Sequence, residues 1–261
     1  MNFEKEFARK VKKKAIKHPA VLFFVLDTFH RDTKRRLKRI VEPNDFILDV
    51  GSLNSPYTVY FSNSVVAIDI PHRGMFGYSG EIVEEIKSRR NLEIVTASGT
   101  NIPFKSKTFD KIICTEVLEH IYADRLAVTE MARVLKADGK AFLTTPNQDG
   151  IPLKCAIEEH VRHYTQKGLR TLLSQFFKQV VIEERFRFWN FLGIAYKFWN
   201  RWSKNKLHIH VLIASLFSSW LYDIVYFFEK LTRANSNYNL VAICSEPRQH
   251  KMLAYEKSQN I

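Results

Sequence analysis

Two carboxylates and a histidine stand directly after an apolar run near the middle of the chain. The run FDKIICT covers residues 109–115, and Glu116, Glu119 and His120 follow it. An imidazole titrates near neutral pH, so His120 could act as a general base. Alternatively, the E-x-x-E-H spacing together with His160 or His163 could bind a divalent cation that orients a diol. A structural role is also open, in which the two carboxylates stabilise the start of a helix.

The segments that must position these side chains alternate between two patterns. Short runs rich in Ile and Val alternate with stretches whose apolar residues recur at helical spacing. Strands alternating with helices predict an α/β fold, with a doubly wound and largely parallel sheet. The expected strands are residues 46–50, 65–70, 92–97, 111–115 and 140–145, and the expected helices between them are residues 80–90 and 123–136.

Polar residues gather where these strands end. In open α/β sheets, ligands bind beyond the carboxyl ends of the strands, at the point where the strand order reverses. A glycine there lets the backbone turn tightly and approach a ligand. An acidic residue ending the second strand suits a ribose diol, because a carboxylate accepts two hydroxyl hydrogen bonds. The strand ends therefore predict a nucleoside-bearing ligand. They carry Asp49, Gly51, Ser52, Asp69, Ser98, Gly99 and Thr100.

Charge is concentrated at one end of this 261-residue chain. The formal net charge is +13, and residues 1–40 hold 13 Lys and Arg against four acidic residues. This predicts a basic helical N-terminal extension, with an amphipathic helix at 4–19 and a second helix at 33–41. Such an extension suits an anionic membrane surface or nucleic acid, although a solvated helix face is an equal alternative. The seven-residue apolar stretch at 20–26 is too short for a signal peptide.

The three cysteines show no C-x-x-C spacing. This argues against a disulfide framework or a cysteine zinc site, and it favours a reducing compartment.

A second segment is rich in aromatic and apolar residues. Residues 186–204 are aromatic and basic, residues 211–228 are almost wholly apolar, and all four tryptophans fall between 186 and 228. Trp and Tyr mixed with Lys and Arg are typical of a membrane interface. A helical lid packed on the domain or on a second copy is the alternative. A single membrane crossing is not expected, because the strand predicted at 239–247 must pair with earlier strands in one sheet.

Five motifs resemble the class I S-adenosylmethionine-dependent methyltransferases, in their broad small-molecule (type 11) branch. The resemblance implies S-adenosylmethionine as cofactor and a Rossmann-like sheet of seven strands, the last antiparallel. It covers about residues 40–185, with Leu53 and Ser55 standing where the family usually has two further glycines. The motifs are DVGS (49–52), AID (67–69), NIPFKSKTFDKIICTEVLEH (101–120), RVLKADGKAFLTTPN (133–147) and HVRHYTQKGLRTLL (160–173).

The resemblance also implies an organisation into three parts and roles for single residues. The parts are a basic extension (1–40), a methyltransferase domain (41–185 plus 238–248) and a helical insertion before the last strand (186–237). Ser98 stands where the family contacts the adenine amine, and Thr115 and Glu116 would face the methionine end of the cofactor. The catalytic candidates are His120, His160, His163 and Tyr164, whereas Thr165 is expected to cap the helix that follows it.

We expect a site without a metal ion. If one binds, the resemblance to metal-using small-RNA 2′-O-methyltransferases and to some quinone-precursor O-methyltransferases implies Glu116, Glu119, His120 and His163 as ligands.

The function expected from these features is methyl transfer to an oxygen of a lipid-linked or cell-surface glycan, or of another membrane-associated small molecule. The protein would be cytoplasmic and peripheral at the inner face of a membrane. A quinone-precursor-type O-methyltransferase with a divalent metal is one alternative. A pseudoenzyme that docks on membranes or RNA is another. Nucleic acid is not the expected partner, because the basic residues cluster in a tail and no RNA-binding motif accompanies them.

Overall fold

The computed structural model describes residues 32–52, 57, 61–70, 91–149, 160–185 and 239–248. By its internal contacts the chain divides into two units, Met1–Lys38 with Phe186–Ser236 and Arg39–Arg185 with Asn237–Ile261. The sheet lies within the second unit. The expected helices at 4–19 and 80–90, and the insertion at 186–237, fall outside the described residues. The helix expected at 33–41 is present at residues 32–40.

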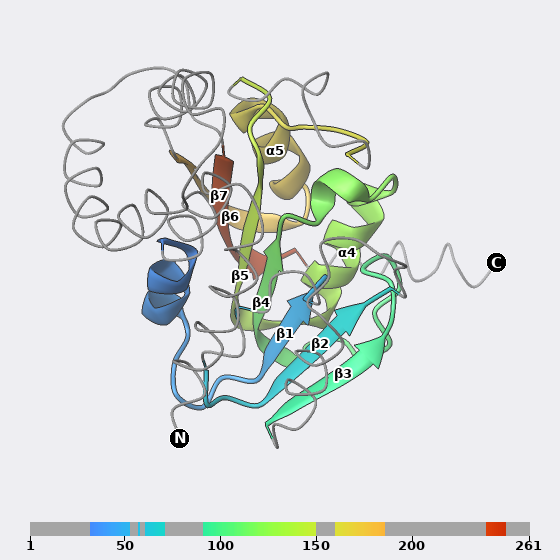
Figure 1. Ribbon diagram of the computed structural model, residues 1–261, viewed down its shortest axis with the longest axis vertical. Helices are drawn as coiled ribbons and strands as arrows, with labels where there is room; N and C mark the ends of the chain where they lie inside the picture. The colour runs from blue at the N-terminus through green and yellow to red at the C-terminus, as the bar shows by residue number, and fades with distance from the viewer. Residues whose placement is uncertain are drawn as a thin grey trace, which may run out of the picture. The chain divides into compact units, whose positions relative to one another are not determined.

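A seven-stranded sheet organises the described part (Figure 1). Its strand order is β3-β2-β1-β4-β5-β7-β6. Strand β7 runs antiparallel to both β5 and β6, whereas the pairs among β1 to β5 are parallel. The predicted Rossmann-like sheet with an antiparallel last strand is therefore confirmed. The strands are β1 (Ile47–Val50), β2 (Val65–Asp69), β3 (Leu92–Thr96), β4 (Phe109–Thr115), β5 (Leu135–Pro146), β6 (Phe177–Arg185) and β7 (Asn239–Pro247).

The reversal of strand order falls between β1 and β4. Strands β2 and β3 extend the sheet on one side of β1, and the chain then returns so that β4 pairs with the other side. The carboxyl ends of β1, β2 and β4 consequently meet at one edge, where open α/β sheets bind their ligands. All four residues of β1 are buried, as expected of a central parallel strand covered on both faces.

Two helices cover one face of the sheet. Side chains of α4 (Asp124–Val134) and α5 (Gln166–Leu173) belong to the same buried cluster as alternate residues of the central strands, such as Ile112 and Leu143. Thr165 caps α5, since its side chain accepts a hydrogen bond from the Gly168 amide at 3.0 Å, as predicted. Within the described residues, no helix is both long and apolar enough to cross a membrane.

Among the described elements, the start of β5 differs most from the prediction. The helix expected at 123–136 ends at Val134, and β5 begins at Leu135 rather than near residue 140. The cause is the loop before β4. The amides of Lys107 and Thr108 donate to the carbonyl oxygens of Arg133 and Val134, at 2.9 and 2.8 Å. These contacts satisfy the last helical carbonyl groups and bring Leu135 into register with Phe109.

Candidate active site

The carboxyl ends of β1 and β2 carry the predicted nucleoside-binding acids. Asp49 is the third of the four residues of β1 and has 1% of its surface exposed, and Asp69 is the last residue of β2. One carboxylate oxygen of Asp69 accepts a hydrogen bond from the Ile70 amide at 2.8 Å. The amide of Gly51 donates to the carbonyl of Ile68 at 2.8 Å, so the turn after β1 bends toward β2. Two acids and a glycine turn thus share one edge of the sheet.

Gly51 adopts a conformation that other residues avoid. Its φ angle is +72°, in the left-handed region. A Cβ atom at this position would lie 2.4 Å from Cγ2 of Val117, which belongs to the loop after β4. The predicted reason for this glycine was close approach to a ligand. The structure adds a second reason, because the two loops that border the site pack against each other through Gly51. Ser52, predicted beside it, is buried.

The segment after β3 forms a tight polar turn. Ser98 Oγ lies 2.8 Å from Thr100 Oγ1 and accepts a hydrogen bond from the Thr100 amide at 3.2 Å. The amide of Asn101 donates to the Ser98 carbonyl at 3.0 Å. A Cβ atom on Gly99 would lie 3.2 Å from Cγ1 of Val50, so this turn lies close to the end of β1. The structure therefore brings the predicted adenine-side residues next to the Asp49 strand.

An acid and an arginine on α4 fix the loop that follows this turn. Glu130 Oε2 accepts a hydrogen bond from the Ile102 amide at 2.9 Å, and Arg133 pairs with Glu130 at 2.7 Å. Arg133 also donates to the carbonyl oxygens of Ile102 and Phe104, at 2.9 and 2.7 Å. The sequence motifs NIPF and RVLK both predicted a methyltransferase, but they predicted no role for Glu130 or Arg133. The signal that could have paired them is an acid three residues before the arginine of RVLK.

Thr115 and Glu116 lie where β4 ends. Thr115 is buried, and Glu116 has a positive φ angle of 55°. The Glu116 carboxylate accepts hydrogen bonds from Thr144 Oγ1 at 2.7 Å and from Asn239 Nδ2 at 2.8 Å. Burial raises the pKa of Glu116, although these two hydrogen bonds oppose the shift. Its carboxylate is thus anchored to β5 and β7. The predicted contact with the methionine end of the cofactor stays a prediction.

Glu119 lies in η2 (Leu118–His120), a short 3-10 helix after β4, and is fully buried. Its Oε2 accepts a hydrogen bond from Thr145 Oγ1 at 3.1 Å, whereas Oε1 has no hydrogen-bond partner among the described residues. Burial and the nearby Glu116 raise the pKa of Glu119 well above its usual range. Its backbone carbonyl accepts from the Val161 amide at 2.8 Å, which brings the His160–His163 segment to the end of β4.

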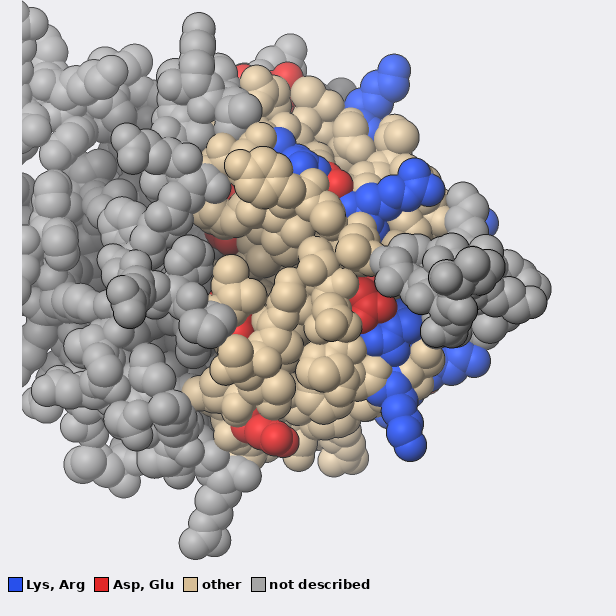
Figure 2. All heavy atoms as spheres, turned by 90° about the vertical axis from the view of Figure 1, so that its right-hand side faces the viewer, with Lys and Arg blue, Asp and Glu red and all other residues tan. Residues whose placement is uncertain are grey.

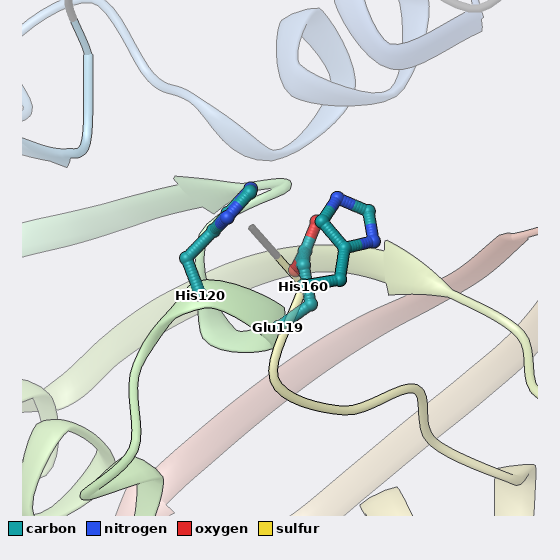
Figure 3. A group of neighbouring side chains, drawn as sticks. All are labelled: Glu119, His120 and His160. Atoms are coloured by element: carbon teal, nitrogen blue, oxygen red, sulfur yellow. The ribbon is translucent and has the colours of Figure 1, made fainter. Parts of the chain in front are cut away.

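Three of the predicted catalytic residues form a histidine group here. The rings of His120 and His160 are 4.6 Å apart between centroids, and His160 Nδ1 lies 2.8 Å from His163 Nε2. Burial, together with the neighbouring His120 and His163, lowers the pKa of His160 to about 4. Figure 3 shows that Glu119, His120 and His160 come from two segments, and their ligand atoms lie within 4.8 Å of one another. Glu116 and His163, expected in a metal set, are not members of this group.

Tyr164, the fourth catalytic candidate, points to α4. It is 7% exposed, and its hydroxyl donates to Asp124 Oδ2 at 2.6 Å, while Arg162 pairs with the same carboxylate. Burial raises the pKa of Tyr164, and the hydrogen bond and charge of Asp124 raise it further. In this arrangement the phenol is a hydrogen-bond donor that ties the His160–His163 segment to α4. A catalytic role for Tyr164 stays a prediction.

Charged side chains on the visible face do not merge into one basic surface. In Figure 2, the Lys and Arg side chains of the described residues stand in separate groups, with uncharged surface and some acidic side chains between them. The basic excess at residues 1–31 lies outside the described part.

Several known proteins resemble parts of this chain. Residues 48–143 match the family described as a methyltransferase domain. An uncharacterized protein of Methanocaldococcus jannaschii is 32% identical over 112 residues, covering 42% of this chain and 41% of its own length. The demethylmenaquinone methyltransferase of Corynebacterium efficiens is 26% identical over 174 residues, covering 65% of this chain and 71% of its own length. The chain thus spans less than half the length of the first of these relatives.

Solved structures share the fold. The phosphoethanolamine N-methyltransferase 2 of Haemonchus contortus, in complex with S-adenosyl-L-methionine, superposes with a TM-score of 0.53 at 17% identity, covering 82% of this chain and 52% of the other. A putative methyltransferase of Bacillus halodurans gives a TM-score of 0.51 at 16% identity, covering 82% and 99%. Residues 48–143 thus match a methyltransferase domain, and the sheet has the fold of the class I S-adenosylmethionine-dependent methyltransferases. The cofactor of this class is S-adenosylmethionine.

Proposed function

We propose that this protein transfers a methyl group from S-adenosylmethionine to an oxygen of a small-molecule acceptor. One observation carries the proposal. The ends of β1, β2 and β4 meet at the reversal of strand order, and they bring Asp49, Asp69 and Thr115 to one edge of the sheet. The glycine turn at Gly51 supports it, because its left-handed backbone packs directly against the loop after β4.

The residues at this edge fit the cofactor. Asp69 would accept hydrogen bonds from the ribose hydroxyl groups, and the turn at Ser98 to Thr100 would meet the adenine ring. Thr115 and the backbone near Gly51 would line the methionine end. When bound, the cofactor supplies a methyl group that is already activated by the sulfonium. The chain must then hold the acceptor in line with that methyl group and exclude water.

The acceptor side would lie at the histidine group. His120, His160 and His163 stand beside the buried Glu119, next to the end of β4. An oxygen acceptor must lose a proton as it is methylated, and nitrogen and carboxylate groups in reach of that oxygen favour its loss. This is why oxygen is the proposed acceptor atom.

The acceptor we favour is a lipid-linked or cell-surface glycan, or another small molecule met at the cytoplasmic face of a membrane. The support comes from the basic residues of segment 1–40 and from the aromatic and apolar residues of 186–228. Flotation with anionic vesicles tests this location. Deletion of residues 1–17 should reduce the part of vesicle binding that is sensitive to salt. The double change Trp199→Ala with Trp202→Ala should reduce the part that resists salt. A full-length protein that never floats at low salt would contradict the membrane proposal.

A quinone precursor is the second candidate acceptor. Demethylmenaquinone methyltransferases from two Corynebacterium species are among the relatives, at 26% and 31% identity. Both acceptor classes can be compared in one assay, in which the protein receives S-adenosylmethionine labelled in the methyl group and fractionated cell extract. Label in a glycan fraction would support the first candidate, and label in a quinone fraction the second. Absence of transfer and of cofactor binding would contradict the proposed enzyme and favour a pseudoenzyme that acts as a binding module.

A further inference from the structure

Three side chains beside the end of β4 have the chemistry and the spacing of metal ligands. Glu119, His120 and His160 each offer one ligand atom, and these atoms all lie within 4.8 Å of one another (Figure 3). Ligands at about 2.0–2.1 Å from a tetrahedral metal ion are about 3.3 Å apart. Small side-chain rotations therefore suffice to close the group around one ion.

Glu119 is held as a ligand would be. Its carboxylate is fully buried, and the Thr145 hydroxyl binds Oε2 at 3.1 Å. The other oxygen, Oε1, has no hydrogen-bond partner in the described part of the chain. A buried carboxylate oxygen without a partner is costly, and bound cations are one of the ways in which proteins satisfy it.

His160 is oriented by a second histidine. Its Nδ1 lies 2.8 Å from Nε2 of His163, which engages one ring nitrogen and leaves Nε2 of His160 for a ligand bond. Metal-binding histidines generally use their second nitrogen in this way, because the outer hydrogen bond fixes both the ring orientation and the tautomer.

Glu116 does not complete the set. Thr144 and Asn239 both donate to its Oε1, which turns this carboxylate toward β5 and β7. The remaining donors are one carboxylate oxygen and two imidazole nitrogens. Imidazole favours transition metals over magnesium or calcium, and three protein ligands leave coordination positions open for a substrate.

We propose that Glu119, His120 and His160 bind one divalent transition-metal ion, and that His163 is a positioning residue for His160. The role of this ion in the reaction rests on the proposed function. It would bind the acceptor hydroxyl and favour loss of its proton to water. The acceptor oxygen then forms its bond to the methyl carbon as the carbon–sulfur bond breaks, and S-adenosylhomocysteine leaves as a neutral thioether.

Metal binding can be measured without turnover. Full-length protein stripped with a chelator is titrated with Mn²⁺ or Zn²⁺ alone, and the bound metal is counted by atomic spectrometry. We expect one ion per chain. Glu119→Gln and His160→Ala should each weaken its affinity by at least about tenfold, and His163→Ala by about 10–100-fold as an outer-shell change. Glu93→Gln, a matched change at an exposed residue of β3, should leave the affinity unaltered.

A second measurement separates loss of a ligand from loss of the fold. Glu119→Gln removes a buried carboxylate whose Oε1 has no partner in the described part, so the metal-free variant should unfold at the same or a higher temperature than the metal-free parent. Glu116→Gln should change the metal affinity less than threefold, because the amide oxygen can still accept from Thr144 and Asn239.

The proposal is overturned if the protein binds no metal ion saturably, or if Glu119→Gln and His160→Ala bind it like the parent. A loss in Glu116→Gln as large as that in Glu119→Gln would overturn the three-residue set. Titration with S-adenosylhomocysteine on the same samples distinguishes the two proposals. Metal binding without cofactor binding would contradict the proposed function and leave the metal site standing, whereas the reverse result would contradict the metal site alone.

Discussion

Replacing Gly51 with alanine tests how the two loops around the site fit together. The new Cβ atom would stand 2.4 Å from Val117 Cγ2 and 3.2 Å from Cγ1, on a backbone with a φ angle of +72°. Val117 is branched at Cβ, so few rotamers are open for its methyl groups to move away. The substitution therefore imposes backbone strain and steric overlap together.

The two costs can be given separate magnitudes. A non-glycine residue in the left-handed region costs about 1–2 kcal/mol. Overpacking a tight contact costs about 1–3 kcal/mol more. We expect Gly51→Ala to lower the free energy of unfolding by about 2–5 kcal/mol, from the sum of these two ranges. Gly51→Val, with a larger side chain, should abolish cofactor binding as well.

A double-mutant cycle isolates the overlap. Val117→Ala removes both methyl groups that the new Cβ would meet, so it should relieve the steric part of the Gly51→Ala defect and leave the backbone part. Urea unfolding of the parent, both single variants and the double variant should give a favourable coupling of about 1–3 kcal/mol. Additive effects, or a Gly51→Ala variant as stable as the parent, would refute the packing of Gly51 on Val117.

Three further changes test other contacts. Tyr164→Phe removes the donor to Asp124 and should cost about 1.5–3 kcal/mol of unfolding free energy; unchanged stability with lost turnover would instead favour a catalytic tyrosine. Burial alone would raise the pKa of Asp110, but hydrogen bonds from Lys136 and from a backbone amide outweigh it and lower this pKa. The contribution of Asp110 to stability is therefore present above about pH 4 and is lost as the pH falls through the lowered pKa. In urea melts, the loss of unfolding free energy caused by Asp110→Asn should consequently become smaller in acid. A loss that does not change with pH would contradict this. Glu130→Gln should speed hydrogen exchange at the Ile102 amide and weaken cofactor binding. Unchanged exchange would show that the hydrogen bond from Ile102 to Glu130 does not hold this loop in place.

The sheet was predictable because its strands are buried on both faces. Runs such as FILDV and VVAIDI are apolar enough to be recognised as buried strands from the sequence, and β1 and β2 lie within them. The start of β5 was not predictable from the same kind of pattern. The start of β5 depends on where α4 ends, and the amides of Lys107 and Thr108 determine that end by binding the last carbonyl groups of α4. These two residues lie in the loop before β4, far from the end of α4 in the sequence.

The sequence predicted which residues would lie near one another better than it predicted their contacts. Asp49, Asp69 and the turn at Ser98 were predicted to lie at one edge because they follow or end parallel strands, and the topology of the sheet alone brings such ends together. The anchoring of Glu116 by Asn239 was not foreseeable, since 123 positions separate the two residues. Nor could local spacing show that Glu119 and His160 share a group, because a backbone hydrogen bond between Glu119 and Val161 creates that proximity.

Calorimetric titration of the full-length protein with S-adenosylmethionine tests the central claim most directly. We expect saturable binding of one cofactor per chain. Asp69→Ala should weaken this binding by about 1.5–3 kcal/mol, because the ribose loses a charged acceptor, and Glu93→Gln, at an exposed position of the neighbouring strand, should bind like the parent. No heat of binding at millimolar cofactor, or parental affinity in Asp69→Ala, would contradict the assignment of this strand edge as the cofactor site.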